Sequence, residues 1–115
     1  MRDRPDTYVL DGAGRPVPEP DPVRWVAWYD ASERARCLAH DVLFGGDDPD
    51  MSVEVATVFL AVDRGGGAGT PVLWETMILG GPQGGRTWGY ATREAALRGH
   101  AAACRAARRS LWPRR

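Results

Sequence analysis

Two apolar segments decide the fold: residues 52–62 read SVEVATVFLAV, and residues 72–79 read VLWETMIL. The first is rich in β-branched residues and becomes apolar on both faces, a pattern typical of a central strand. The sequence GGGAG at residues 65–69 lies between the two segments and is the kind of flexible stretch that forms a loop tip. The two segments therefore predict an antiparallel hairpin inside a sheet.

Three shorter segments are also predicted to be strands, at residues 7–10, 33–43 and 87–91. The first ends at the turn pair Asp11-Gly12. The second fits neither the helical nor the strand period well, and we interpret it as a strand that ends at Gly45-Gly46. By contrast, residues 15–22 contain four prolines, which we take to be too many for regular structure.

A first helix is predicted from its start signals. Asp21 is a good N-cap, and Pro22 suits the first helical position, where its missing N–H costs nothing. Trp25, Trp28 and Tyr29 then fall at positions i, i+3 and i+4, on one face of a helix that continues to about residue 31. We interpret this aromatic stripe as part of the core.

A second helix is predicted to begin at the N-cap Thr92, with Glu94 in the first turn, where the helix dipole favours an acid. Pro113 ends it. One face of the helix is mostly small or apolar, and its residues are Leu97, His100, Ala101, Cys104 and Leu111. We therefore expect it to dock on the sheet by this face.

This order of elements predicts one α+β domain, residues 1–115, with a single antiparallel sheet of about four to five strands and two helices packed on one face. Residues 1–6 and 112–115 are predicted to be flexible ends. A chain of 115 residues forms one core, which excludes a two-domain enzyme.

All fifteen basic residues are Arg, and the chain has no Lys. This excludes the mechanisms that need an amine, which are the phosphate-loop lysine, the Schiff base and the lysine general base. Neither glycine-rich segment, at residues 65–69 and 80–85, matches a phosphate loop or a dinucleotide fingerprint, and each lies between predicted strands.

The formal charge of zero hides an asymmetry. Residues 1–92 hold eight Arg against fourteen acidic residues, whereas residues 93–115 hold seven Arg against Glu94 alone. A basic terminal helix is typical of contact with nucleic acid or an acidic partner, with Arg105, Arg108 and Arg109 as the candidate contacts. It also fits arginines that only solvate an alanine-rich helix and favour its C-terminal end.

The sequence contains no apolar run of the roughly 18 residues that a membrane span needs, and residues 1–5 do not begin a signal peptide. We therefore expect a cytoplasmic protein without a membrane partner. A structural disulfide between the two cysteines is not expected in a reducing compartment.

A pattern extends along the second half of the chain: TVFL at residues 57–60, Asp63, WETMILGG at 74–81, YAT at 90–92, EA at 94–95 and GH at 99–100. It resembles a family of small uncharacterised bacteriophage and prophage proteins, in which the runs read like STVFLG-D-H, FETM-V-F-GG and Y-T-W-EEA-GH. Arg64 stands where these relatives often have His, so no role of that His carries over, and Trp74 stands where they have Phe. The resemblance implies a phage or mobile-element context and no particular chemistry.

Glu75 is a candidate site residue because its neighbours of the same strand parity, Leu73, Met77 and Leu79, are apolar. A carboxylate in such a row is either perturbed by burial, as in many functional sites, or satisfied by an Arg or by the hydroxyls of Tyr90 or Thr57. Together with Asp63 and His100 it could form the pocket of a small enzyme or nucleotide-binding protein.

A metal site is a further hypothesis. Cys37 and His40 are spaced C-x2-H, and His100 and Cys104 are spaced H-x3-C on one helical face, so the four residues could form a Cys2His2 zinc set. Against it, Cys37 and His40 would point to opposite faces of a strand. The alternative is that His100 is a partly buried ring that donates to a strand carbonyl or to Glu75.

The function that we expect is binding of a host macromolecule, such as a defence or regulatory component, without catalysis and without a cofactor. The expected contact surface combines the glycine-rich hairpin tip with exposed Trp88 and Tyr90, because aromatic residues dominate binding hot spots. Nucleic-acid binding through the arginine-rich helix and the small enzyme remain alternatives, and a homodimer is compatible with the charge asymmetry.

Overall fold

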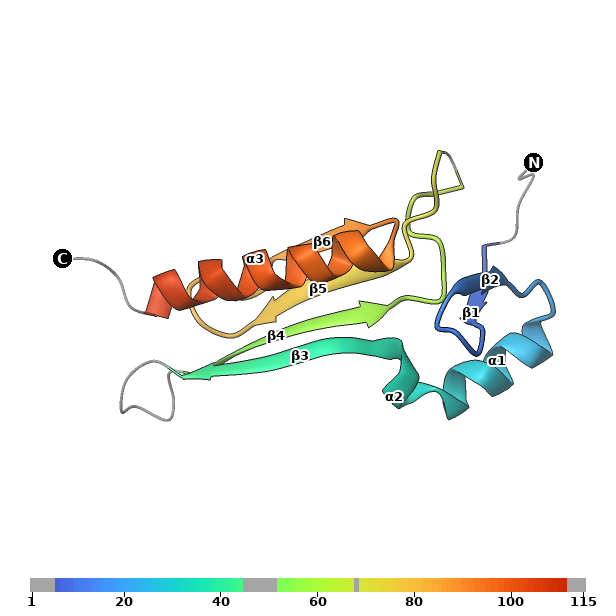
Figure 1. Cartoon of the computed structure of the whole chain (residues 1–115), viewed down its shortest axis with the longest axis horizontal. Helices are drawn as coiled ribbons and strands as arrows, with labels where there is room; N and C mark the ends of the chain where they lie inside the picture. The colour runs from blue at the N-terminus through green and yellow to red at the C-terminus, as the bar shows by residue number, and fades with distance from the viewer. Residues whose placement is uncertain (1–5, 45–51, 68, 112–115) are drawn as a thin grey trace.

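The structure is a computed structural model, and it describes residues 6–44, 52–67 and 69–111. It has the predicted α+β class, but with two sheets (Figure 1). In chain order the elements are β1 (Tyr8–Leu10), β2 (Pro16–Pro18), α1 (Pro22–Ala31), α2 (Glu33–Arg36), β3 (Cys37–Phe44), β4 (Ser52–Phe59), β5 (Trp74–Leu79), β6 (Thr87–Tyr90) and α3 (Arg93–Leu111). The ends predicted to be flexible lie outside the described residues except for Asp6, and so does the strand end predicted at Gly45-Gly46.

The main sheet has the order β3-β4-β5-β6, and every neighbouring pair is antiparallel. The predicted hairpin is present as β4 and β5, with Thr57 opposite Thr76. β4 ends at Phe59 and not at residue 62, because Ala61 has a positive φ of 63° that turns the chain out of the sheet. The interpretation of residues 33–43 as a strand is right only from Cys37 onward, because a single helical turn, α2, precedes it.

The prediction of a single sheet is corrected by β1 and β2, which form a separate two-stranded sheet. Asp11 N donates to Arg15 O, and Glu19 N donates to Thr7 O. In an antiparallel ladder this alternation puts Pro16 and Pro18 at positions that are not hydrogen-bonded, so their missing N–H groups cost nothing. Residues 15–22 are therefore not irregular throughout, because the prolines recur with the period of the ladder.

The prediction of two helices on one face is also corrected. α3 lies along the four-stranded sheet and contacts all four strands, whereas α1 lies beside β1 and β2 at one end of the molecule (Figure 1). The predicted N-caps are both present: Asp21 accepts from Val23 N and Arg24 N, and Thr92 Oγ1 accepts from Ala95 N.

The aromatic stripe of α1 joins the two parts. Trp25 Nε1 donates to Tyr8 O and to Ala61 O, each over 3.1 Å. Trp28 packs edge-on against Phe59, the last residue of β4, with ring centroids 6.0 Å apart. The stripe is half-buried against the core cluster that contains Phe59, as its interpretation as a core face requires.

The core lies between the sheet and α3. Alternate residues of the central strands face the helix and are buried: Val53, Val55, Thr57 and Phe59 on β4, and Trp74, Thr76 and Ile78 on β5. The helix presents mainly small buried side chains, such as Ala96, Ala103 and Ala107. Close packing is therefore possible along its length.

The other side of this sheet is here called the open face, and no described helix lies along it. By strand register it carries His40, Val42 and Phe44 from β3, Glu54, Ala56 and Val58 from β4, and Glu75, Met77 and Leu79 from β5. Three of its apolar side chains are well exposed, with relative exposures of 44% for Val42, 61% for Phe44 and 46% for Leu79.

Candidate functional site

A chain of hydrogen bonds runs from the core to the edge of the sheet through His100 of α3, which is only 6% exposed. His100 Nδ1 lies 2.8 Å from Thr57 Oγ1, and Thr57 Oγ1 lies 2.6 Å from Thr76 Oγ1. On the other side of the ring, His100 Nε2 lies 2.6 Å from Asp41 Oδ2. The ring therefore links α3 to β3, β4 and β5 at once.

The donor and the acceptor of each hydrogen bond can be assigned by starting from Asp41. An ionised Asp41 has no proton to donate and can only accept hydrogen bonds. His100 Nε2 must therefore carry the proton and act as the donor to the carboxylate. In a neutral imidazole Nδ1 then accepts from the Thr57 hydroxyl, and Thr57 accepts from Thr76. The hydrogen bond from His100 lowers the pKa of Asp41 below its usual value, since it stabilises the charged form.

Cys104 lies one helical turn after His100 and is also buried. Its Sγ is 3.7 Å from Asp41 Oδ2, and its thiol is the donor. Burial raises the pKa of this thiol, and the neighbouring Asp41 carboxylate raises it further. Cys104 is thus a protonated thiol at neutral pH and not an activated nucleophile.

The Cys2His2 set, which was only a hypothesis, is not formed. His40 lies on the open face, where its Nε2 is 3.0 Å from Glu54 Oε1. Cys37 is exposed at the start of β3. In the described part of the chain, the metal-ligating atoms that do gather belong to Asp41, His100 and Cys104, and they all lie within 4.8 Å of one another.

Sequence reasoning missed Asp41 because the facing of β3 could not be read from its pattern. Asp41 follows His40 directly, so the two side chains take opposite faces of the strand. Pairing of Asp41 with buried Val55 puts the carboxylate on the face of α3. The signal available in the sequence was the His100–Cys104 spacing, which marks one face of the helix that carries this site.

The pocket predicted for Glu75, Asp63 and His100 is contradicted by the register of the sheet. Glu75 pairs with Val58 and lies on the open face, whereas His100 bonds to Thr57 on the opposite face. Asp63 Oδ1 accepts from the loop amides Gly65 N and Val72 N. The hydrogen bonds suggested from Glu75 to Tyr90 or Thr57 are wrong for the same reason, since both of those residues face α3.

Trp88 and Tyr90 were expected to be exposed, but they are half-buried under α3. A Cβ at Gly99 would collide with the Tyr90 ring and hydroxyl, so the glycine is what lets the ring lie against the helix. The Arg86 guanidinium lies over the Trp88 ring, 5.0 Å from its centroid. A cleft of about 240 Å³ separates β6 from α3 here.

The three arginines predicted as contacts, Arg105, Arg108 and Arg109, are exposed on α3. Among the described side chains, none of the three forms an ion pair. After the hydrogen bond from His100, the charge of Arg108 also lowers the pKa of Asp41.

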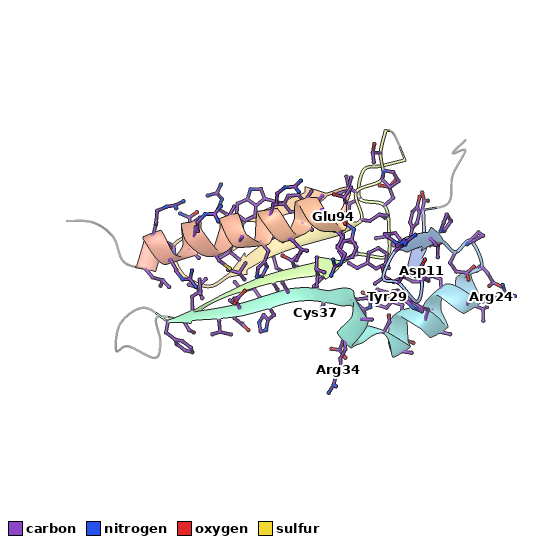
Figure 2. The ribbon with its side chains drawn as sticks, viewed as in Figure 1. Asp11, Arg24, Tyr29, Arg34, Cys37 and Glu94 are labelled. Carbon is purple, nitrogen blue, oxygen red and sulfur yellow. The ribbon has the colours of Figure 1, made fainter. Side chains whose placement is uncertain are left out.

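A larger cleft of about 810 Å³ lies where the start of α3 approaches the β1–β2 turn and α2. Trp74 lines it, and its Nε1 is the one buried side-chain N or O atom in the described part of the chain without a hydrogen-bond partner. Figure 2 places Cys37 and Glu94, which both line the cleft, at this end of the sheet.

No family model matches the chain, and neither a curated protein nor a solved structure matches it. Of the helices that the structure describes, none is both long enough and apolar enough to cross a membrane.

Proposed function

We propose that the protein acts by binding another protein through the open face of its four-stranded sheet. The observation that carries this proposal is the exposure of Val42, Phe44 and Leu79, three large apolar side chains on one side of one sheet. Large apolar side chains that are exposed together on one face of a sheet are typical of binding surfaces. The side chains come from β3 and β5, so they lie on a rigid scaffold.

The charges on this face define the chemistry of the partner. In the register of the sheet, Glu54 lies between Val42 and Leu79. Glu75 pairs with Val58 farther along the same face. The face is therefore apolar with acidic groups beside it. It fits a partner surface of apolar side chains flanked by Arg or Lys, because complementary charge directs encounter and disfavours other partners.

The biological setting of this proposal is that of a phage or mobile-element accessory protein, which the residue pattern at positions 57–100 supports by resemblance. The partner is then a protein of the bacterial host, such as a defence or regulatory component. The open face takes the place of the hairpin tip with Trp88 and Tyr90 as the contact surface, since both aromatic rings pack against α3.

The experiment compares affinity capture by three tagged chains from host cells, with quantification of each captured protein. The double variant Val42→Arg, Leu79→Arg changes two exposed positions of the open face, and Leu97→Arg changes a position on α3 that is 38% exposed. We expect the wild-type chain and the Leu97 variant to capture the same protein, and the double variant to lose at least tenfold of it. Capture that survives the double variant, or no specific capture by the wild-type chain, would contradict the proposal.

Nucleic-acid binding through α3 is the second candidate, because the exposed Arg105, Arg108 and Arg109 form no ion pair with the described residues. It requires retention on DNA or RNA that weakens steeply with salt and that falls when the three arginines become Ala. Retention that is unchanged by these substitutions excludes the role of α3.

A further inference from the structure

We propose that Asp41, His100 and Cys104 bind a divalent transition-metal ion of the Zn²⁺ class at the edge of the sheet. One oxygen, one nitrogen and one sulfur atom, from three side chains on two elements, lie within 4.8 Å of one another. Carboxylate, imidazole and thiolate are the three side-chain ligands that Zn²⁺ takes in proteins, and three of them with one open position make the usual reactive site. This inference is independent of protein binding at the open face, which lies on the other side of the sheet.

Two of the three distances between ligand atoms require little movement, and the third, between His100 Nε2 and Cys104 Sγ, is at most 4.8 Å. His100 and Cys104 are one turn apart on the buried face of a 19-residue helix, so their separation is set by the helix. Two ligand atoms that each lie about 2.1 Å from a tetrahedral ion are roughly 3.4 Å apart. The His100–Asp41 contact must therefore open from 2.6 Å by less than an ångström, while the Cys104–Asp41 contact of 3.7 Å is already close to its final value. Asp41 can supply this movement because its side chain is 52% exposed on an edge strand.

The surroundings orient the histidine as metal sites generally do. Thr57 holds Nδ1, and Nε2 points to the Asp41 carboxylate oxygen, which also lies 3.7 Å from Cys104 Sγ. A second hydrogen bond that fixes the ring is a general feature of metal-bound histidine. When the ion takes Nε2, the ring proton resides on Nδ1 and is donated to Thr57 Oγ1, which in turn donates to Thr76.

The proton balance is simple. The imidazole changes tautomer without losing a proton, Asp41 is already a carboxylate, and Cys104 Sγ gives its proton to water and binds as the thiolate. One proton is thus released for each ion bound. The exposed side of Asp41 provides the entry path.

The experiment uses the purified full chain and Co²⁺ as a spectroscopic substitute for Zn²⁺. Thiolate coordination gives a thiolate-to-Co²⁺ charge-transfer band in the near ultraviolet. We expect the band to saturate at one ion per chain and to be bleached by added Zn²⁺. It should disappear in Cys104→Ser, and the apparent affinity should fall at least tenfold in Asp41→Asn.

The chain itself supplies matched controls. Cys37→Ser and His40→Ala remove the other cysteine and the other histidine, and both should keep the full band at the wild-type affinity. The proposal is overturned if the wild-type chain gives no band, if the band persists in Cys104→Ser, or if it is lost in Cys37→Ser. Cys104→Ser retains the size of the side chain, and its circular dichroism spectrum establishes that loss of the band is not loss of the fold.

Discussion

His100 Nε2 on α3 donates to Asp41 Oδ2 on β3 over 2.6 Å, between residues that are 59 positions apart in the sequence. Because Thr57 holds the other ring nitrogen, a single side chain fixes the helix to the edge strand and to the centre of the sheet. The bond adds to the packing of the buried alanines of α3 on the same face of the sheet. The candidate metal site includes both residues of this bond, whereas the proposed binding surface lies on the other side of the sheet.

Replacement of His100 should destabilise the protein strongly. His100→Ala leaves the buried Thr57 hydroxyl and the Asp41 carboxylate without their partner and opens a cavity beneath α3. We expect the free energy of unfolding to fall by about 2 to 4 kcal/mol in chemical denaturation. His40→Ala is the matched control, because that ring is 46% exposed and its contact with Glu54 is worth no more than about 1 kcal/mol. Equal losses in the two variants would show that the buried bonds of His100 contribute nothing.

Asp41 should make the stability depend on acid pH. Its pKa is lowered in the folded state, so its contribution is present above the pKa of the unfolded chain, near 4, and is lost as pH falls through the folded-state pKa. In Asp41→Asn the free energy of unfolding should therefore decline less steeply below about pH 4 than in the wild-type chain. The difference should vanish in a His100→Ala background, since the hydrogen bond from His100 is its main cause. A difference of the same size in that background would assign the effect to another group.

The two cysteines should differ in their reaction with thiol reagents. Cys37 is exposed, whereas Cys104 is buried and has a raised pKa, so little of it is thiolate at neutral pH. With a disulfide reagent in the absence of metal, we expect one fast and one slow equivalent per chain. Cys37→Ser should retain only the slow reaction, and Cys104→Ser only the fast one. Rapid reaction of Cys104 in the native chain would contradict the burial of this site.

The contact between Gly99 and Tyr90 should be revealed by a double-mutant cycle. Gly99→Ala puts a methyl group where the Tyr90 ring lies, so we expect a loss of about 1 to 3 kcal/mol in the free energy of unfolding. Tyr90→Ala removes the obstacle, and adding Gly99→Ala to it should cost nothing or even stabilise the helix, where Ala is better than Gly. If the two substitutions lowered the free energy of unfolding additively, the Tyr90 ring would not lie against Gly99.

The parts of the fold that could be predicted are those whose signals are local. β4 and β5 each carry their own strand pattern, and Asp21 and Thr92 each begin a helix by a cap within a few residues. The strand β2 could not be predicted from local sequence. Its prolines are tolerated because the register with β1 puts them at positions that are not hydrogen-bonded, and that register is known only once the two strands are paired.

Prediction of the site required knowing which side of the sheet each side chain faces, and local sequence patterns do not contain this information. Both faces of β5 hold apolar residues, so its sequence does not say whether Glu75 or Thr76 turns towards α3. In β3 an irregularity between Cys37 and Ala39 shifts the register and so sets which side Asp41 takes. Glu75 was therefore assigned to the wrong surroundings, and Asp41 was missed.

The central claim is that the open face is the surface by which this protein binds another. Its most direct test is photo-crosslinking in host cells from a photoreactive amino acid placed at Val42, compared with the same amino acid at Arg105 on α3. We predict a discrete adduct of the chain with one other protein from position 42 and none from position 105. Adducts from position 105 alone, adducts with a second copy of this chain only, or no adduct from position 42 would contradict the claim.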